Sequence, residues 1–481
     1  MSSLIDILRF RDWREGMSLI YFALVLVCVS MAIVMESVLP IAIPLIVLVV
    51  VFSATQFEKL FLLLWITIPL STEFSVTDSL GTDMPAEPIM WILFGFYILM
   101  WSHSSRIRNS AAFKHPVFAL IVLHLGWIFI TFIYAVDQVV ALKFFLSKLW
   151  YVGVFFLLAY YMLDNRKKFN RIMTAVFASL LFTAVIIFIR HAIEGGLTFA
   201  SINSVVDPFY RNKVNYSSLI ALFLPILAYL FTESSKGSVW RKFLVVSFVF
   251  LVIAMYFGYT RAAMIAAVAS AFTPFILRFK LIKPILVAGV LAAGFLSWYM
   301  FEGETYLEHA PDYDRTIMHQ RFDNLLEATY QFEDISTMER FYRWIAGYYM
   351  VVDEPVTGFG PNNFYGSYKP YTVLSFQTYV SDNPEQSGIH NYYLMLMVEQ
   401  GIPGFVIFFA LIVVFLVRAQ KIYEKLDPGP DRNLLTAVTA SMIVILLLQL
   451  MNDQIEVDKV GTFFWLWLAI LVKMEYGWRN R

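Results

Sequence analysis

Long apolar segments recur along the chain from Met17 to Val472, and short polar connections separate most of them. Most of these segments approach or exceed the roughly 18 residues that a helix needs to cross a ~30 Å hydrocarbon layer. A bilayer offers no water to backbone N–H and C=O groups, so a segment that crosses it must be helical. The alternating pattern of an outer-membrane barrel does not occur here. The sequence therefore predicts an all-α, polytopic membrane helix bundle.

The candidate spans divide the chain into three parts. An N-terminal transmembrane bundle is expected over 1–301, a large loop domain over 302–390, and C-terminal transmembrane helices over 391–481. The segment before the first span is basic and amphipathic, which predicts a retained helix on the cytoplasmic membrane surface. The third candidate is short, so about 12–14 spans are expected. The candidates lie near 17–35, 38–55, 59–71, 88–102, 116–135, 139–163, 172–190, 214–232, 243–259, 262–278, 284–301, 391–417, 434–451 and 460–475.

The distribution of basic residues predicts the orientation of the bundle. Lys and Arg accumulate in the cytoplasmic connections of membrane proteins. With the N-terminus inside, 24 of the 36 basic residues fall in inner connections. This pattern predicts that both termini lie in the cytoplasm and that the loop 302–390 lies on the outer side.

The large loop has its own sequence pattern. Apolar residues at helical spacing predict amphipathic helices over 312–332 and 336–352, and Pro355 ends the second one. The glycines and proline of Gly358–Phe364, GFGPNNF, predict a tight turn. An aromatic run follows, and two interpretations stay open: a belt at the membrane interface, or rings that stack against sugars. The run consists of Tyr365, Tyr368, Tyr371, Phe376 and Tyr379.

A histidine and an amide, His390 and Asn391, stand at the start of the apolar segment that follows the loop. The N-terminus of a helix carries partial positive charge and disfavours imidazolium. We therefore expect His390 to be neutral near pH 7, with a ring nitrogen able to accept a proton. The alternative is a histidine that only caps the helix or bridges it to the loop.

Several arginines depart from the positive-inside tendency, because they fall in outer connections. Such an arginine needs a salt-bridge partner or an anionic ligand. Arg211 and Arg261 have few acidic neighbours in the sequence, which makes them candidates for ligand binding. Two guanidinium groups on one side can hold a diphosphate by bidentate, charge-assisted hydrogen bonds. For Arg261 the alternative is a side chain that extends to the lipid headgroups.

Taken together, four stretches resemble the O-antigen ligase/polymerase superfamily of bacterial envelope proteins, over roughly residues 205–415. They are PFYRNKVNYSSLIALFLP, TRAAMIAAV, ERFYRWIAGYYMVVDEPVTGFGPNNF, and HNYYL with the EQGIPG that follows it. The resemblance rests on their order, spacing and outward placement, because no single stretch is specific.

The resemblance implies a metal-independent glycosyltransferase of the bacterial inner membrane, without cofactor or nucleotide. Such proteins move a glycan from undecaprenyl diphosphate to a hydroxyl of another glycan or of lipid A-core at the periplasmic face, as polymerases or ligases. Arg211 and Arg261 would bind the diphosphate, with Arg190 as an alternative to Arg211. His390 would deprotonate or orient the acceptor hydroxyl. The residues implied to shape the loop and the site are Arg340, Gly358, Gly360 and Asn391.

Other classes of protein fit the sequence less well. A transporter or flippase for lipid-linked glycans tends to have internal repeats and ionisable residues near the membrane midplane. Here charged residues within or beside spans are few, and no repeat is evident; the few are Glu36, Lys143, Lys148 and Glu399. A formal net charge of zero gives no bulk signal for nucleic acid. The one cysteine, Cys28, excludes an internal disulfide, and no Cys/His cluster has metal-ligand spacing.

Overall fold

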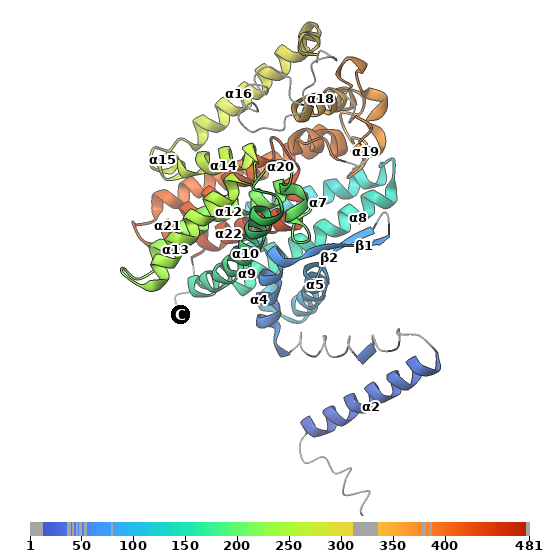
Figure 1. Ribbon diagram of the computed structural model, residues 1–481, viewed down its shortest axis with the longest axis vertical. Coiled ribbons are helices and arrows are strands. Elements are labelled where there is room, and N and C mark those ends of the chain that lie inside the picture. The colour runs from blue at the N-terminus through green and yellow to red at the C-terminus, as the bar shows by residue number, and fades with distance from the viewer. Residues whose placement is uncertain are drawn as a thin grey trace, which may run out of the picture. The chain divides into compact units, whose positions relative to one another are not determined.

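The computed structural model describes residues 13–35, 40, 43–44, 47, 51, 55–77, 80–310, 335–377, 381–383 and 387–477 (Figure 1). Most of the predicted N-terminal surface helix and of the span near 38–55 lies outside the described residues. The helix predicted over 312–332 and Tyr379 also lie outside them. The chain divides into two compact units, residues 1–63 and 64–481.

The first unit contains α2 (Trp13–Val34), and α4 (Phe57–Thr67) runs across the boundary. The second unit contains nearly all of the remaining helices. They are α5 (Ala86–His103), α6 (Ser105–Arg108), α7 (Pro116–Ile133), α8 (Gln138–Tyr151), a π-helical turn (Val152–Leu158), α9 (Ala159–Met162), α10 (Arg166–Glu194), α11 (Ile202–Val206), α12 (Lys213–Glu233), α13 (Val239–Tyr256), α14 (Arg261–Ala271), α15 (Thr273–Arg278), α16 (Ile282–Phe301), α18 (Ile335–Asp353), α19 (Phe364–Ser367), α20 (Tyr392–Lys425), α21 (Pro430–Leu448) and α22 (Asp458–Glu475).

The all-α membrane bundle is confirmed. Within the described residues, nine helices are long and apolar enough to cross a membrane. Their bounds follow the predicted spans closely; for example, the span expected at 214–232 is α12. One element was not expected, an antiparallel hairpin of β1 (Thr72–Thr77) and β2 (Leu80–Met84). It occupies a connection too short and too polar to signal a sheet.

The interior of the second unit is built around α12, α21 and α22. Each of them is buried along most of its length, and α12 packs directly against α21. Ser441 links all three helices: its Oγ donates to the Leu222 carbonyl at 2.7 Å, and Trp467 Nε1 donates to Ser441 Oγ at 3.0 Å. Such bonds satisfy groups that hydrocarbon cannot. By contrast, α16 buries only Ile282 within its own length.

A break divides α20 into two helical pieces at Gly401, which has φ 68° and ψ 177°. The turn that follows α18 fits into this break. The Glu399 carboxylate accepts the backbone N–H groups of Asn362 at 2.8 Å and Phe364 at 3.2 Å. The Phe359 N–H donates to the Val398 carbonyl at 2.9 Å. The turn therefore satisfies the polar backbone groups that the break would otherwise leave buried and unpaired.

The same turn also holds the connection between α7 and α8, two helices that lie side by side (Figure 1). The Val136 N–H donates to the Phe359 carbonyl at 3.1 Å, and the Asp137 N–H donates to Asn363 Oδ1 at 2.6 Å. A Cβ on Gly360 would lie 2.2 Å from the Cβ of Ala135. Three parts of the chain that are far apart in sequence therefore meet at one end of the bundle.

Gly358→Ala should destabilise this junction. Gly358 has φ +64°, and an added Cβ would lie 2.5 Å from the Val398 carbonyl oxygen and 2.6 Å from the Glu399 carbonyl carbon. Strain and overpacking together should lower the free energy of unfolding by about 2 kcal/mol or more, measured by thermal unfolding in detergent. Gly366→Ala is the matched control, since nothing lies within 4 Å of its added Cβ. Equal unfolding of the two variants would contradict this account of the junction.

Candidate functional site

The candidate residues lie on connections at one end of the bundle. Arg211 comes just before α12, Arg261 begins α14, and His390 comes just before α20. Thr260 Oγ1 donates to the Lys213 carbonyl at 3.3 Å, which joins the start of α14 to the start of α12. The Tyr392 N–H donates to the Gln449 carbonyl at 2.9 Å, which joins the start of α20 to the end of α21. Because α21 packs against α12, α14 and α20, these ends belong to one face.

Two side chains of α18 hold the peptide that leads into His390. Arg343 Nη1 donates to the Gly388 carbonyl at 3.2 Å, and Trp344 Nε1 donates to the Ile389 carbonyl at 3.0 Å. His390 itself has φ 58°, a conformation that non-glycine residues rarely adopt. Asn391 then caps α20, because its Oδ1 accepts the Leu394 N–H at 3.1 Å. The capping role therefore belongs to Asn391.

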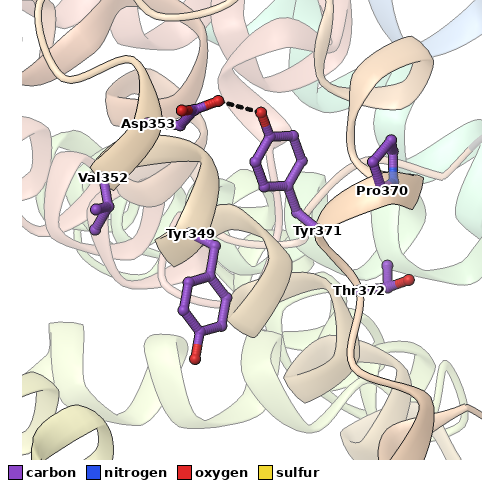
Figure 2. Close-up of a pocket in the computed structure, with 6 residues that line it drawn as sticks. All are labelled: Tyr349, Val352, Asp353, Pro370, Tyr371 and Thr372. Carbon is purple, nitrogen blue, oxygen red and sulfur yellow. Dashed lines mark hydrogen bonds between the residues drawn. The ribbon is translucent and has the colours of Figure 1, made fainter.

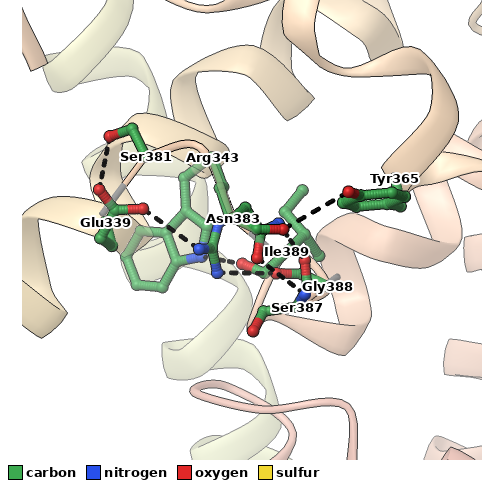
Figure 3. A network of polar contacts seen from close by, with 9 residues as sticks. Glu339, Arg343, Tyr365, Ser381, Asn383, Ser387, Gly388 and Ile389 are labelled. Carbon is green, nitrogen blue, oxygen red and sulfur yellow. Dashed lines mark hydrogen bonds and ion pairs between the residues drawn. The ribbon is translucent and has the colours of Figure 1, made fainter. Parts of the chain in front are cut away.

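We call the bonds of Arg343 and Trp344 to the Gly388 and Ile389 carbonyls the clamp. A polar network holds Arg343 in place, as Figure 3 shows. Arg343 is 5% exposed, and its Nη2 donates to Glu339 Oε2 at 3.1 Å. Glu339 Oε1 accepts from Ser381 Oγ at 2.6 Å. Asn383 accepts the Ser387 N–H at 2.9 Å and donates to the Ser387 carbonyl at 2.9 Å. A buried guanidinium that is paired in this way fixes the position of the peptide before His390.

The surroundings of His390 keep its imidazole neutral. Burial lowers the pKa of His390 to about 3, and the positive charges of Arg340 and Arg343 act in the same direction. The neutral state was expected from the helix N-terminus, whereas the structure attributes it to burial and to these arginines. His390 Nδ1 is buried, and within the described part of the chain it has no hydrogen-bond partner. That nitrogen therefore has unused hydrogen-bonding capacity.

Asp453 is a member of the site that the sequence reasoning missed. It lies in the connection between α21 and α22, and a Cβ on Gly388 would come within 2.8 Å of Asp453 Oδ2. Burial raises the pKa of Asp453, whereas the charges of Arg211 and Arg343 lower it. This carboxylate therefore connects Arg211 electrostatically with the clamp beside His390. In the sequence it is one acid in a polar connection, which gave no signal.

The two candidates for the first phosphate ligand have different surroundings. Arg190 donates to the Asp207 carbonyl and forms an ion pair with Glu194 at 3.5 Å, so its guanidinium holds the connection after α10. Arg211 is exposed, and its charge acts on Asp453 and on Asp83 of β2. Arg190 therefore has bonding partners within its own connection, and Arg211 stays a prediction for the phosphate ligand. Arg261 is half-buried at the first position of α14.

The residues implied to shape the site act in different places. The charge of Arg340 acts on His390, and Asn391 caps the helix that follows it. Gly358 and Gly360 lie instead in the turn on the break of α20, where they pack against the 398–400 backbone and Ala135. Their contribution to the site is indirect, through the position of α20.

The charges at this end suit an anionic ligand. The positive charges of Arg340 and Arg343 act on His390, and those of Arg211 and Arg343 act on Asp453, where the charge of Glu456 opposes them. A phosphate group would find donors there, and a hydroxyl would find an unprotonated nitrogen.

Residues 246–409, about a third of the chain, match the family model described as O-Antigen ligase. The resemblance to the O-antigen ligase/polymerase superfamily is therefore confirmed over this part of the chain. The match includes Arg261, Arg340 and His390, whereas Arg211 and Asp453 lie outside it. No curated protein matches the chain. The protein is thus a multi-pass membrane protein with a ligase- or polymerase-type function.

The imidazole of His390 should remain neutral in the folded protein at pH 5. Its pKa of about 3 lies below the ordinary value of 6.5, so the unfolded chain binds the extra proton between these values. Stability should therefore decrease as pH falls through this range. Nitrogen-15 imidazole spectra of the purified protein, assigned with His390→Gln, measure the ionisation directly. A midpoint near 6.5 would contradict the burial of this group.

Proposed function

We propose that the protein is a metal-independent glycosyltransferase of the bacterial inner membrane. It moves a glycan from undecaprenyl diphosphate to an acceptor hydroxyl at the periplasmic face, as an O-antigen or exopolysaccharide polymerase or as an O-antigen ligase. The observation that carries this proposal is that Arg343 and Trp344 of α18 hold the peptide before His390, and that the charges of Arg343 and Arg211 both act on Asp453 beside that peptide. The family match supports the reaction class, and the distribution of Lys and Arg supports the orientation.

In this proposal Arg211 and Arg261 bind the diphosphate of the carrier. Charge-assisted bonds from guanidinium groups stabilise the negative charge that grows on the leaving diphosphate. The bond between the anomeric carbon and the diphosphate oxygen breaks, and a bond from that carbon to the acceptor oxygen forms. Undecaprenyl diphosphate leaves with the bonding electron pair. Attack from the opposite face inverts the anomeric centre.

His390 receives the proton of the acceptor hydroxyl. By itself its low pKa makes it a weak base, because burial and two arginines oppose the positive charge. The bound diphosphate brings negative charge next to the imidazole, and an opposite charge favours the protonated form. Binding of the carrier therefore strengthens the base when the acceptor has to be activated.

His390→Ala should abolish transfer while the variant still inserts and folds. General bases contribute about 10²–10⁴-fold to a rate, so product formation should fall by at least a hundredfold. The assay is reconstitution with lipid-diphosphate glycan, with and without lipid A-core, and it reports which acceptor is extended. His103→Ala is the control, since His103 is exposed at the C-terminal end of α5. Transfer by His390→Ala at the wild-type rate would exclude the base role.

Arg261→Lys should be almost as harmful as Arg261→Ala. Lysine keeps the charge but cannot reproduce the planar fork that binds two phosphate oxygens. The loss of one charge-assisted bond should weaken carrier binding by about tenfold or more, measured as KM for the lipid-linked donor. Arg278→Lys is a matched control, because Arg278 ends α15 at the opposite end of the same span. A lysine variant with an unchanged KM would indicate an arginine that only reaches the headgroups.

A further inference from the structure

A pocket of about 480 Å³ lies away from His390, between the C-terminal end of α18 and the short helical turn Lys369–Tyr371 (Figure 2). It is lined by Tyr349, Val352, Asp353, Pro370, Tyr371 and Thr372. The first three come from α18 and share one face of that helix. The transfer reaction proposed above does not use any of these six side chains.

The polar groups of the pocket are held in place. The Tyr371 hydroxyl donates to Asp353 Oδ2, as Figure 2 shows. The Tyr349 hydroxyl bonds with that of Tyr306 at 2.7 Å. The ring of Tyr371 also packs edge-on against Phe359, with 5.7 Å between centroids. These contacts restrict two aromatic rings and a carboxylate before any ligand arrives, which lowers the entropy lost on binding.

These groups fit a carbohydrate. A sugar ring has an apolar face of C–H groups, which packs on an aromatic ring, and an edge of hydroxyl groups that donate hydrogen bonds. Tyrosine offers a large apolar face with a polar tip, and an ionised carboxylate has about four acceptor positions for hydroxyl donors. Asp353 also repels phosphate, so the pocket suits a neutral or amino sugar and not the diphosphate of the carrier.

The position of the pocket relates it to the transfer site. Helix α18 carries both Arg343, which holds the peptide before His390, and Asp353, which lines the pocket. Ten residues of helix separate the two, or about 15 Å at 1.5 Å per residue. A single sugar at the transfer site cannot reach so far, whereas a chain of several sugars can.

We propose that this pocket is a distal subsite that binds the glycan chain several sugars from the reacting carbon. The inference deepens the proposed function and rests on it for the identity of the ligand. The subsite would hold longer glycans, and it would leave the chemistry at His390 unchanged.

Binding of free glycan tests the subsite without any turnover. The probe is glycan released by mild acid from the lipid-diphosphate carrier of the bacterium that makes the protein. The whole chain is studied in lipid nanodiscs by isothermal titration calorimetry. Wild type should bind saturably, and Asp353→Asn and Tyr371→Ala should each weaken binding by about tenfold. Glu354→Gln is the matched control, since Glu354 is an exposed acid beside Asp353 that does not line the pocket.

The outcomes separate the subsite from the proposed function. Binding that these variants weaken supports the subsite even if no transfer is detected. Transfer by the wild type, with no saturable binding of released glycan or with undiminished binding by the variants, overturns the subsite and leaves the proposed function intact. Tyr371→Phe keeps the ring and loses the bond to Asp353, so it tests the site if Asp353→Asn fails to fold. It should weaken binding by about threefold, and a wild-type affinity would overturn the subsite.

Discussion

The structure depends on the need to pair every buried backbone group around the break of α20. Gly401 interrupts that helix, and the Glu399 carboxylate accepts two N–H groups from the turn at Asn362 and Phe364. The same turn bonds to the connection between α7 and α8. Helix α18 leads directly into this turn, so the turn fixes the position of α18. Its side chains Arg343 and Trp344 therefore reach the peptide before His390. The irregular backbone at Gly401 is thus stabilised by a second irregular segment, the turn Gly358–Phe364, which follows the helix that contacts the site.

The position of His390 explains why its imidazole is neutral. Burial and the charges of Arg340 and Arg343 disfavour imidazolium, and Arg343 is itself paired with Glu339. Asp453 lies beside the same peptide, and burial raises its pKa. Arginine charge therefore lies near a neutral imidazole, an arrangement that suits binding of a diphosphate followed by acceptance of a proton.

The sequence predicted the fold well because span length and apolar composition follow directly from the bilayer. It also predicted that a helix begins near Asn391 and that Gly358–Phe364 forms a turn, because both signals are local, whereas the cap by the Asn391 side chain was not predicted. Contacts between distant segments gave no such signal. The pairing of Glu399 with the turn, the role of Asp453 beside Gly388, and the contacts of Arg190 with Asp207 and Glu194 depend on tertiary packing. Tertiary packing also gives the members of the aromatic run different environments. Tyr368 and Phe376 are buried, whereas Tyr371 lines a pocket.

The central proposal is that the guanidinium groups of Arg211 and Arg261 and the imidazole of His390 act on one carrier headgroup. A structure of the whole chain in lipid nanodiscs with undecaprenyl-diphosphate-linked glycan tests it most directly, through the distances from the phosphate oxygens. The account predicts both guanidinium groups within hydrogen-bonding distance of the diphosphate, with His390 facing the first sugar. A diphosphate bound elsewhere, or one that reaches only one of the three side chains, would contradict it.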